Sequence, residues 1–175
     1  MFYKVMTKMG TEQHTLINER IAVRAVILHQ NKLLLIHSNL GDYKFPGGGV
    51  EDNENHKEAL IREIREETGY IHCIVKDKIG TIVERKIDDY NSEAIFQMTS
   101  HYYVCKLFSD EKVNQKLDDY EYEQDFTPVW VPIDEAIKQN ERVLKSLGKN
   151  DWVKRETFVL KEIKKDEWSI AGSNR

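Results

Sequence analysis

Apolar residues recur along the chain in short runs whose length and composition are typical of strands. Five such runs predict strands over 21–30, 32–37, 71–83, 95–108 and 128–133. The first two flank Asn31 closely enough to predict a β-hairpin with its turn at that residue. The next two are separated by a polar stretch, 84–93, which predicts a loop. For residues 1–19 the pattern supports at most a peripheral strand.

The segment 55–68 changes to a helical period and has the clearest boundary signals in the chain. Asn55 and Glu58 have the three-residue spacing of a capping box, and Gly69 follows as the residue that ends the helix.

Two later segments also predict helices. Asp134 is the expected cap of one helix, which ends near Gly148, and Asp151 opens another. Strands gathered around one central helix, with more helix at the end, favour an α/β (α+β) fold in which a mixed β-sheet is sandwiched between α-helices.

The chain has the length of one domain. Its 175 residues contain no repeat, low-complexity tract or proline-rich linker. We therefore expect a single domain over 1–175, with a peripheral N-terminal segment at 1–19 and a flexible tail at 169–175.

Charge and cysteine content restrict the partners. The formal net charge of −4 gives no global attraction to nucleic acid or to an anionic membrane, so neither partner is expected. A polyanionic substrate would have to be met by a metal ion or by local cations. Cys73 and Cys105 form no CxxC motif and are interpreted as reduced thiols, and no apolar run reaches the length of a signal or membrane span. These features predict a soluble, cytoplasmic protein.

Three carboxylates share one side of the helix predicted at 55–68. With Glu63 at 0°, a turn of about 100° per residue places Glu67 at about +40° and Glu66 at about −60°. Like charges so placed repel one another, and the arc borders the apolar stripe of the helix. Grouped carboxylates are typical ligands of hard cations such as Mg²⁺. The glycines at 47–49 would let the backbone approach the same ion or a phosphate.

Taken singly, these features have simpler interpretations, because an acidic helix is commonly a solvated face and a glycine run is commonly a turn. Together they resemble a known motif, the Nudix box, over Gly48 to Tyr70. Its specified positions are present here as Gly48, Glu54, Arg62, Glu63, Ile64, Glu66, Glu67, Gly69 and Tyr70. Every specified position matches in type and spacing.

The resemblance implies a Nudix hydrolase and the Nudix fold. Members cleave a phosphoanhydride bond in a nucleoside diphosphate linked to another moiety, with Mg²⁺ as cofactor and Mn²⁺ as a substitute. It further implies that Glu66 and Glu67 bind metal, that Glu63 binds metal or deprotonates the water, and that the Gly47 carbonyl completes the metal cage. Arg62 would pair with Glu66 and hold it in position, and Glu54 would close the loop against the helix.

Further candidates lie outside the box. The family often takes another acid from a late loop, and the acidic segment 118–125 offers Glu121 or Glu123 as a metal ligand or base, unless it is only a solvated loop. Arg24 interrupts an apolar strand, so it either meets substrate phosphate in a cleft or lies on the solvent side of an edge strand. Lys44 and Phe45 precede the glycine loop and are candidates for substrate binding, with core packing as the alternative.

The substrate class is less sharply indicated. The segment 84–87 lacks the proline found in ADP-ribose hydrolases of the family, and Tyr90 comes later than the tyrosine of dinucleoside polyphosphate hydrolases. The preferred hypothesis is a nucleoside triphosphate pyrophosphatase, including one that acts on oxidised purine nucleotides. The alternatives are an ADP-ribose or nucleotide-sugar pyrophosphatase and a non-catalytic nucleotide sensor. Family members are often dimers, which makes a homodimer a further expectation.

Overall fold

The computed structural model describes residues 1–147 and 150–166. The strands are β1 (Phe2–Thr7), β2 (Leu16–His29), β3 (Lys32–His37), β4 (Tyr43–Lys44), β5 (Cys73–Ile87), β6 (Ala94–Leu107) and β7 (Thr127–Pro132). The helices are α1 (His56–Thr68), α2 (Asp119–Glu123), α3 (Ile133–Leu147) and α4 (Asp151–Lys165). Within these ranges no helix is both long and apolar enough to span a membrane. The predicted tail at 169–175 and the helix end near Gly148 lie outside the described residues.

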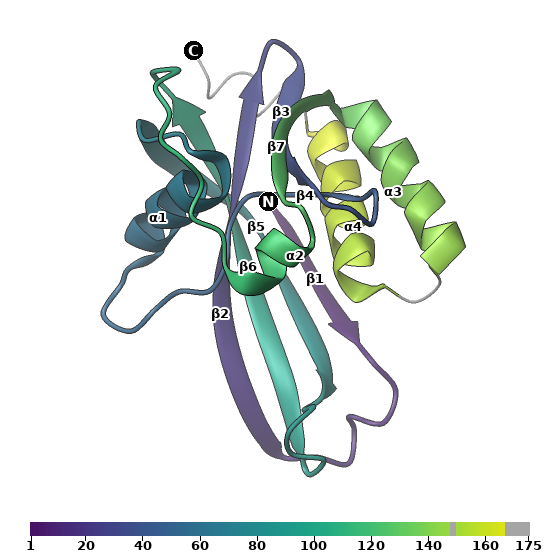
Figure 1. Cartoon of the computed structure of the whole chain (residues 1–175). Helices are drawn as coiled ribbons and strands as arrows, with labels where there is room; N and C mark the ends of the chain where they lie inside the picture. The colour runs from purple at the N-terminus through teal and green to yellow at the C-terminus, as the bar shows by residue number, and fades with distance from the viewer. Residues whose placement is uncertain (148–149, 167–175) are drawn as a thin grey trace.

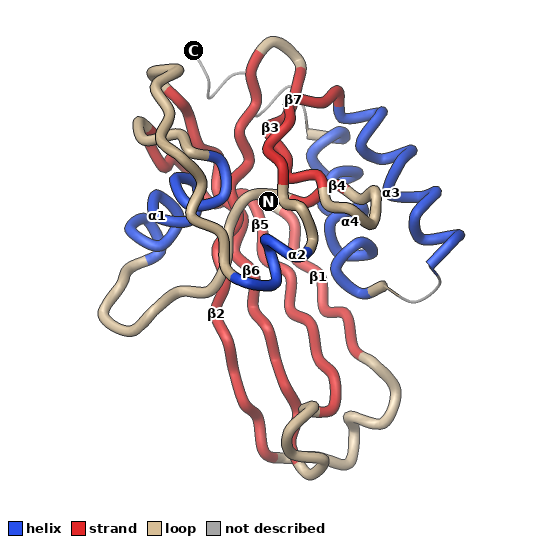
Figure 2. Tube along the Cα trace, viewed as in Figure 1, coloured by secondary structure: helices blue, strands red, loops and turns tan. Residues whose placement is uncertain are grey.

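The strands form one mixed sheet in the order β1-β5-β6-β2-β3-β4, with β7 paired to β3. The β1·β5 and β2·β6 pairs are parallel, whereas β5·β6, β2·β3, β3·β4 and β3·β7 are antiparallel. Helix α1 lies on one side of the sheet and α3 and α4 lie on the other (Figures 1 and 2). The predicted α+β fold, a mixed sheet between helices, is therefore confirmed.

The first hairpin is explained by its turn. Gln30 and Asn31 both have positive φ, 47° and 61°, which is the conformation of the tight turns that suit the twist of paired strands. Asparagine tolerates this conformation better than most residues, so the turn falls at the residue that the sequence indicated.

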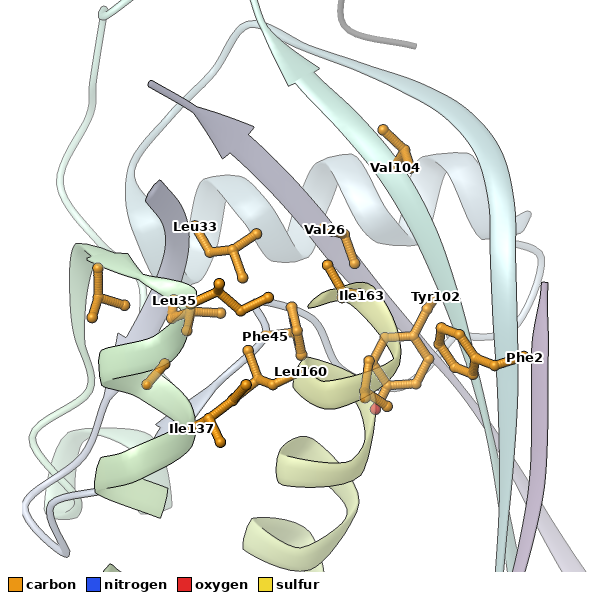
Figure 3. Packing of buried hydrophobic residues seen from close by; sticks show 14 of the residues in the cluster. Phe2, Val26, Leu33, Leu35, Phe45, Tyr102, Val104, Ile137, Leu160 and Ile163 are labelled. Atoms are coloured by element: carbon orange, nitrogen blue, oxygen red, sulfur yellow. The ribbon is translucent and has the colours of Figure 1, made fainter. Parts of the chain in front are cut away.

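Two apolar cores lie on opposite faces of the sheet. One joins the sheet to α3 and α4 and includes Phe45, Tyr102 and Leu160 (Figure 3). The other joins β2 and β6 to α1 through residues such as Leu60 and Ile64. The helix that carries the grouped carboxylates is thus fixed to the sheet by its apolar side.

A buried ionic network ties α4 to the sheet. Arg155 Nε donates to Glu156 Oε1 over 2.8 Å, and one of its terminal nitrogens contacts Glu84 of β5 at 2.7 Å. Glu156 also accepts hydrogen bonds from the Tyr102 hydroxyl and from the backbone N–H of Phe45. Burial alone would raise the pKa of Glu156, but the charges of Arg155 and Arg24 and the hydrogen bond from the Phe45 N–H hold it below its usual value. The network therefore links α4 to the sheet through buried, hydrogen-bonded ion pairs.

Several element boundaries differ from the prediction. Strand β2 starts at Leu16, five residues before the apolar run, β5 continues to Ile87, and β6 begins at Ala94, so the loop predicted at 84–93 is shorter. These extensions lack a continuous buried apolar run, and backbone pairing with neighbouring strands forms them. Asp134 lies inside the first turn of α3 and is not its cap. The short elements β4 and α2 were not predicted, and the peripheral strand expected near the start is β1.

Candidate active site

Helix α1 has the termini that its sequence predicted. The Asn55 side chain accepts hydrogen bonds from the N–H groups of Lys57 and Glu58, and the Glu58 carboxylate accepts one from the Asn55 N–H. Gly69 ends the helix with φ 80° and donates to the Arg65 carbonyl. These caps set the start and the end of the helix, and thereby the positions of the carboxylates between them.

The glycine loop runs beside β2. The N–H of Val23 donates to the Gly48 carbonyl over 2.9 Å, and the Val50 N–H donates to the Ile21 carbonyl over 3.0 Å. Gly47 has a φ of +142°, and a Cβ there would lie 2.0 Å from the Val23 carbonyl oxygen. Only glycine fits at this position, so the loop is held against the strand by a contact that a side chain would break.

Two alanine substitutions distinguish the effect of this close contact from the general effect of replacing a glycine in the loop. Gly47→Ala is expected to lower the free energy of unfolding by about 2 kcal/mol or more, because it combines backbone strain with a clash against β2. Gly49→Ala is the control, since its Cβ would meet only the end of the Arg20 side chain at 2.8 Å. Urea denaturation of both variants measures the difference, and equal losses would contradict the close-approach account.

Glu63 faces the loop from α1. It is 8% exposed, and a Cβ on Gly48 would lie 2.4 Å from its Oε1, so the carboxylate lies directly against the loop backbone. Burial raises the pKa of Glu63, and the hydrogen bond from Arg62 opposes that rise. A carboxylate with a raised pKa is a competent proton acceptor near neutral pH.

Glu67 is fully buried one turn further along α1. Its Oε2 accepts a hydrogen bond from the Gly47 N–H over 2.7 Å. Within the described ranges Oε1 is one of three buried side-chain polar atoms that have no hydrogen-bond partner. Burial raises the pKa of Glu67, nearby Lys44 lowers it, and the negative charges of Glu121 and Glu63 raise it further. This oxygen thus lacks the hydrogen-bond donor that a buried carboxylate oxygen requires.

Arg62 links the loop to the carboxylates. It donates two hydrogen bonds to Glu54, at 2.7 and 2.9 Å, one to the Gly49 carbonyl at 2.9 Å and one to Glu63 at 2.8 Å. The predicted pairing with Glu66 is present at 3.1 Å. Glu54 also accepts from the N–H of Glu51, which closes the loop against the helix as predicted. Arg62 therefore positions the loop and two carboxylates at once.

Glu121 and Glu123, the two candidate metal ligands of the late acidic segment, have different surroundings. Glu121 on α2 is 5% exposed and accepts hydrogen bonds from the Asp118 N–H and the Tyr120 hydroxyl, both at 2.9 Å. Its negative charge raises the pKa of both Glu63 and Glu67, so it lies within electrostatic range of them. Glu123 is exposed, and its backbone carbonyl accepts from Asn39. The structure therefore brings Glu121 to the α1 carboxylates.

The predicted substrate-binding residues have different surroundings. Arg24 lies in β2 inside the sheet, is 7% exposed and donates to the Gly47 carbonyl, so its interpretation as an exposed residue of an edge strand is wrong. Lys44 is buried with its Nζ 4.0 Å from the centre of the Phe126 ring, and burial lowers its pKa. Phe45 is fully buried in the core against Tyr102, so its side chain does not line the site as a substrate contact, because apolar packing takes the whole ring.

The carboxylate oxygens gathered here are the type of ligand that a divalent cation prefers. Within the described ranges no three His, Cys, Asp or Glu side chains are arranged as a ready metal-binding group. Glu63 and Glu66 are held by Arg62, and Glu67 by the Gly47 N–H. The unpartnered oxygen of Glu67 and the mutual repulsion with Glu63 and Glu121 are both relieved by a cation. The carboxylates are therefore the residues that could hold a metal here.

A model of the NUDIX domain matches residues 18–150, more than half of the chain. This chain belongs to the Nudix family. The ADP-ribose pyrophosphatase of Methanocaldococcus jannaschii is 38% identical over 73 residues, which are 39% of this chain and 43% of that relative. Nudix hydrolase 25 of Arabidopsis thaliana is 24% identical over 147 residues, covering 72% of this chain and 84% of the relative.

One further relative is similar over a short stretch of sequence, and one solved structure is similar in fold. The 8-oxo-dGTP diphosphatase of Proteus vulgaris is 43% identical over 42 residues, 23% of this chain and 38% of that relative. The solved structure of a Nudix hydrolase from Nitrosomonas europaea has a TM-score of 0.55 at 21% identity, covering 79% of this chain and 85% of that one. At this identity the structural match shows the shared Nudix fold.

One residue beside the glycine loop was not predicted. Arg20 of β2 lies with its guanidinium 2.8 Å from where a Gly49 Cβ would be. The available signal was the two-residue period of a strand, which puts Arg20 and Arg24 on one face of β2. That signal became readable only once β2 was known to begin at Leu16.

Proposed function

We propose that this Nudix protein hydrolyses a phosphoanhydride bond in a nucleoside diphosphate linked to another moiety, with a divalent cation, Mg²⁺ or Mn²⁺, as cofactor. The observation that carries the proposal is the meeting of three buried or nearly buried carboxylates, Glu63, Glu67 and Glu121, beside a glycine loop. Such a group is costly to the fold unless it binds a cation, and phosphate chemistry is the use for which that arrangement is suited.

Each residue has a proposed role. Glu66, Glu67 and Glu121, with the Gly47 carbonyl, would hold the cation, and Glu63 would accept the proton of the attacking water or share in binding the metal. A bound divalent cation supplies charge neutralisation at the diphosphate and lowers the pKa of water. Arg62 keeps Glu63 and Glu66 in place, and Arg24 fixes the Gly47 carbonyl through its hydrogen bond. Lys44 would stabilise negative charge near Glu67.

The first substrate class proposed is a nucleoside triphosphate, including oxidised purine nucleotides, as the box and the segment after it indicate. The 8-oxo-dGTP diphosphatase relative supports this choice over its 42 matched residues. ADP-ribose or a nucleotide sugar is the second candidate, favoured by the longer match to an ADP-ribose pyrophosphatase. We propose small nucleotides as the only partners required, with action as a cytoplasmic enzyme.

A substrate panel tests the proposal. The purified protein with Mg²⁺ is incubated with nucleoside triphosphates, 8-oxo-dGTP, ADP-ribose and nucleotide sugars, and the products are identified by mass spectrometry. A triphosphate should give the monophosphate and pyrophosphate, whereas ADP-ribose should give AMP and ribose 5-phosphate. Binding of a nucleotide without turnover of any would favour the sensor alternative and contradict the proposal.

A matched pair of variants tests the role of α2. Glu121→Gln is expected to lower kcat by about tenfold or more, because a buried charge beside the α1 carboxylates is removed while the shape is kept. Glu123→Gln is the control two residues away, where the side chain is exposed and no change is expected. Initial rates at saturating substrate measure both. A fall in Glu123→Gln with none in Glu121→Gln would reverse the assignment.

A further inference from the structure

We propose that Asn140 of α3 and Glu156 of α4 are positioning residues of the active site, because they hold the backbone of β4 and thereby set where the Gly47 carbonyl lies. This inference rests on the proposed function, in which that carbonyl is a ligand of the divalent cation. It gives the two helices on the side of the sheet opposite α1 a part in forming the cation site (Figure 1).

Strand β4 has a neighbouring strand on one side only. In the described part of the chain it pairs with β3 alone. The Asp42 carbonyl accepts a hydrogen bond from the N–H of Ser38, the residue after β3, so Asp42 turns its backbone groups toward that strand. Because the direction alternates along a strand, the backbone groups of Tyr43 and Phe45 face away from β3. Buried backbone groups without partners are costly, so this outer side needs hydrogen bonds from elsewhere in the chain.

Side chains of α3 and α4 supply these hydrogen bonds. The Asn140 side chain accepts one from the Tyr43 N–H over 2.8 Å and donates one to the Tyr43 carbonyl over 2.9 Å, as the backbone of a neighbouring strand would. Glu156 Oε2 accepts another from the Phe45 N–H over 2.9 Å. Both Asn140 and Glu156 are fully buried, so water does not compete for these bonds.

Glu156 is itself held in a fixed orientation. Its Oε1 accepts hydrogen bonds from Arg155 Nε over 2.8 Å and from the Tyr102 hydroxyl over 3.2 Å. Arg155 in turn contacts Glu84 of β5, and Tyr102 belongs to β6, so two strands of the sheet fix the carboxylate. The Phe45 N–H therefore meets an acceptor whose position is set by the interior of the protein.

The backbone held by Glu156 leads directly into the glycine loop. Only Pro46 separates Phe45 from Gly47, and its ring restricts φ to about −65°. The Gly47 N–H donates to Glu67 Oε2 over 2.7 Å, and the Gly47 carbonyl accepts a hydrogen bond from Arg24. A displacement of Phe45 would therefore be transmitted to Gly47. It would change the position of Gly47 relative to Glu67, whose other oxygen has no hydrogen-bond partner.

Binding of Mn²⁺ alone tests this inference without any substrate. Free Mn²⁺ is measured by electron paramagnetic resonance in titrations of the wild type, Asn140→Leu and Glu156→Leu. Each variant removes hydrogen bonds to β4 and leaves every proposed metal ligand in place, so the Kd for Mn²⁺ should rise about tenfold or more. Asn140 carries no charge, so weaker binding in Asn140→Leu cannot arise from loss of a negative charge. Wild-type affinity in either variant would overturn the role of the residue replaced.

A third variant controls for loss of stability. Ile163 of α4 is 2% exposed, and its apolar side chain packs in the same core but makes no hydrogen bond to β4. Thermal unfolding of Ile163→Ala should show a lower Tm, because a cavity replaces part of the side chain. Its Kd for Mn²⁺ should nevertheless equal that of the wild type. A rise as large as that in Asn140→Leu would overturn the inference.

Amide chemical shifts give a readout of loop position in the metal-free protein. The ¹⁵N-labelled full chain in EDTA is compared with each variant by NMR. The Gly47 and Gly48 signals should move in Asn140→Leu and Glu156→Leu but not in Ile163→Ala. Circular dichroism shows whether each variant is folded, and if Glu156→Leu does not fold, Asn140→Leu alone decides the outcome. Unchanged Gly47 and Gly48 signals in Asn140→Leu would contradict the inference.

The outcomes separate this inference from the proposed function. Metal-dependent turnover by the wild type, with wild-type Mn²⁺ affinity in Asn140→Leu, would overturn the positioning role and leave the hydrolase intact. Weaker Mn²⁺ binding in both variants, with no turnover of any substrate by the wild type, would support the positioning role and contradict the hydrolase. A wild type that binds no Mn²⁺ would contradict both, because the Gly47 carbonyl would then be no metal ligand.

Discussion

The Glu63→Gln variant is expected to lose hydrolysis by about a hundredfold or more while keeping the wild-type fold. Glu63 lies against the glycine loop and is held by Arg62, so the amide keeps its size and position but no longer accepts a proton or carries a charge. Because burial raises the pKa of this carboxyl, its neutral substitute should not destabilise the protein. Initial rates with Mg²⁺, and thermal unfolding of both proteins, measure the two effects.

Two results would contradict that role. Wild-type kcat in Glu63→Gln would remove Glu63 from the reaction, and a large loss of stability would make the residue structural. Glu123→Gln serves again as the control for loss of one negative charge, because its exposed position predicts wild-type rates.

The Arg155→Met variant is expected to lose about 3–5 kcal/mol of unfolding free energy, because removal of one partner leaves buried charge unpaired. Arg155 is 2% exposed and bonds both Glu156 and Glu84, so two carboxylates lose their cation. Urea denaturation measures the loss. The loss should become smaller once the pH is low enough to protonate Glu156, because an unpaired buried carboxyl is costly in its ionised form.

A second pair on the same helix is the matched control. Lys161 of α4 contacts Glu141 of α3 at 2.6 Å, but both side chains are roughly half exposed. Lys161→Met should therefore cost less than about 1 kcal/mol. Equal costs for Arg155→Met and Lys161→Met would show that the buried network does not hold α4 to the sheet.

The sequence predicted the central part of the site because local interactions determine it. The capping box at Asn55 and Glu58 and the terminal Gly69 fix α1 through contacts between residues at most four positions apart. The helical period then places Glu63 and Glu67 on neighbouring turns without any knowledge of the tertiary fold. The Nudix resemblance added the glycine loop, which the structure brings to the same helix.

Residues that depend on distant partners were not resolved by sequence. Arg24 looked like a charge in a strand, and only the sheet order shows that β2 is an interior strand with its arginine on the Gly47 carbonyl. Glu121 and Glu123 are alike in sequence, and their difference arises from the way α2 presents one side chain to α1. Phe45 directly precedes the glycine loop in the sequence, and packing against Tyr102 places it in the core.

The metal dependence of hydrolysis is the most direct test of the central claim that the α1 carboxylates form a phosphoanhydride hydrolase site. Rates on the best panel substrate are measured in EDTA and then with increasing Mg²⁺ or Mn²⁺, for the wild type and Glu63→Gln. We predict no turnover in EDTA, saturable recovery with either cation in the wild type, and at least a hundredfold lower rate in the variant at every concentration. Turnover that persists in EDTA, or equal rates in the two proteins, would contradict the account.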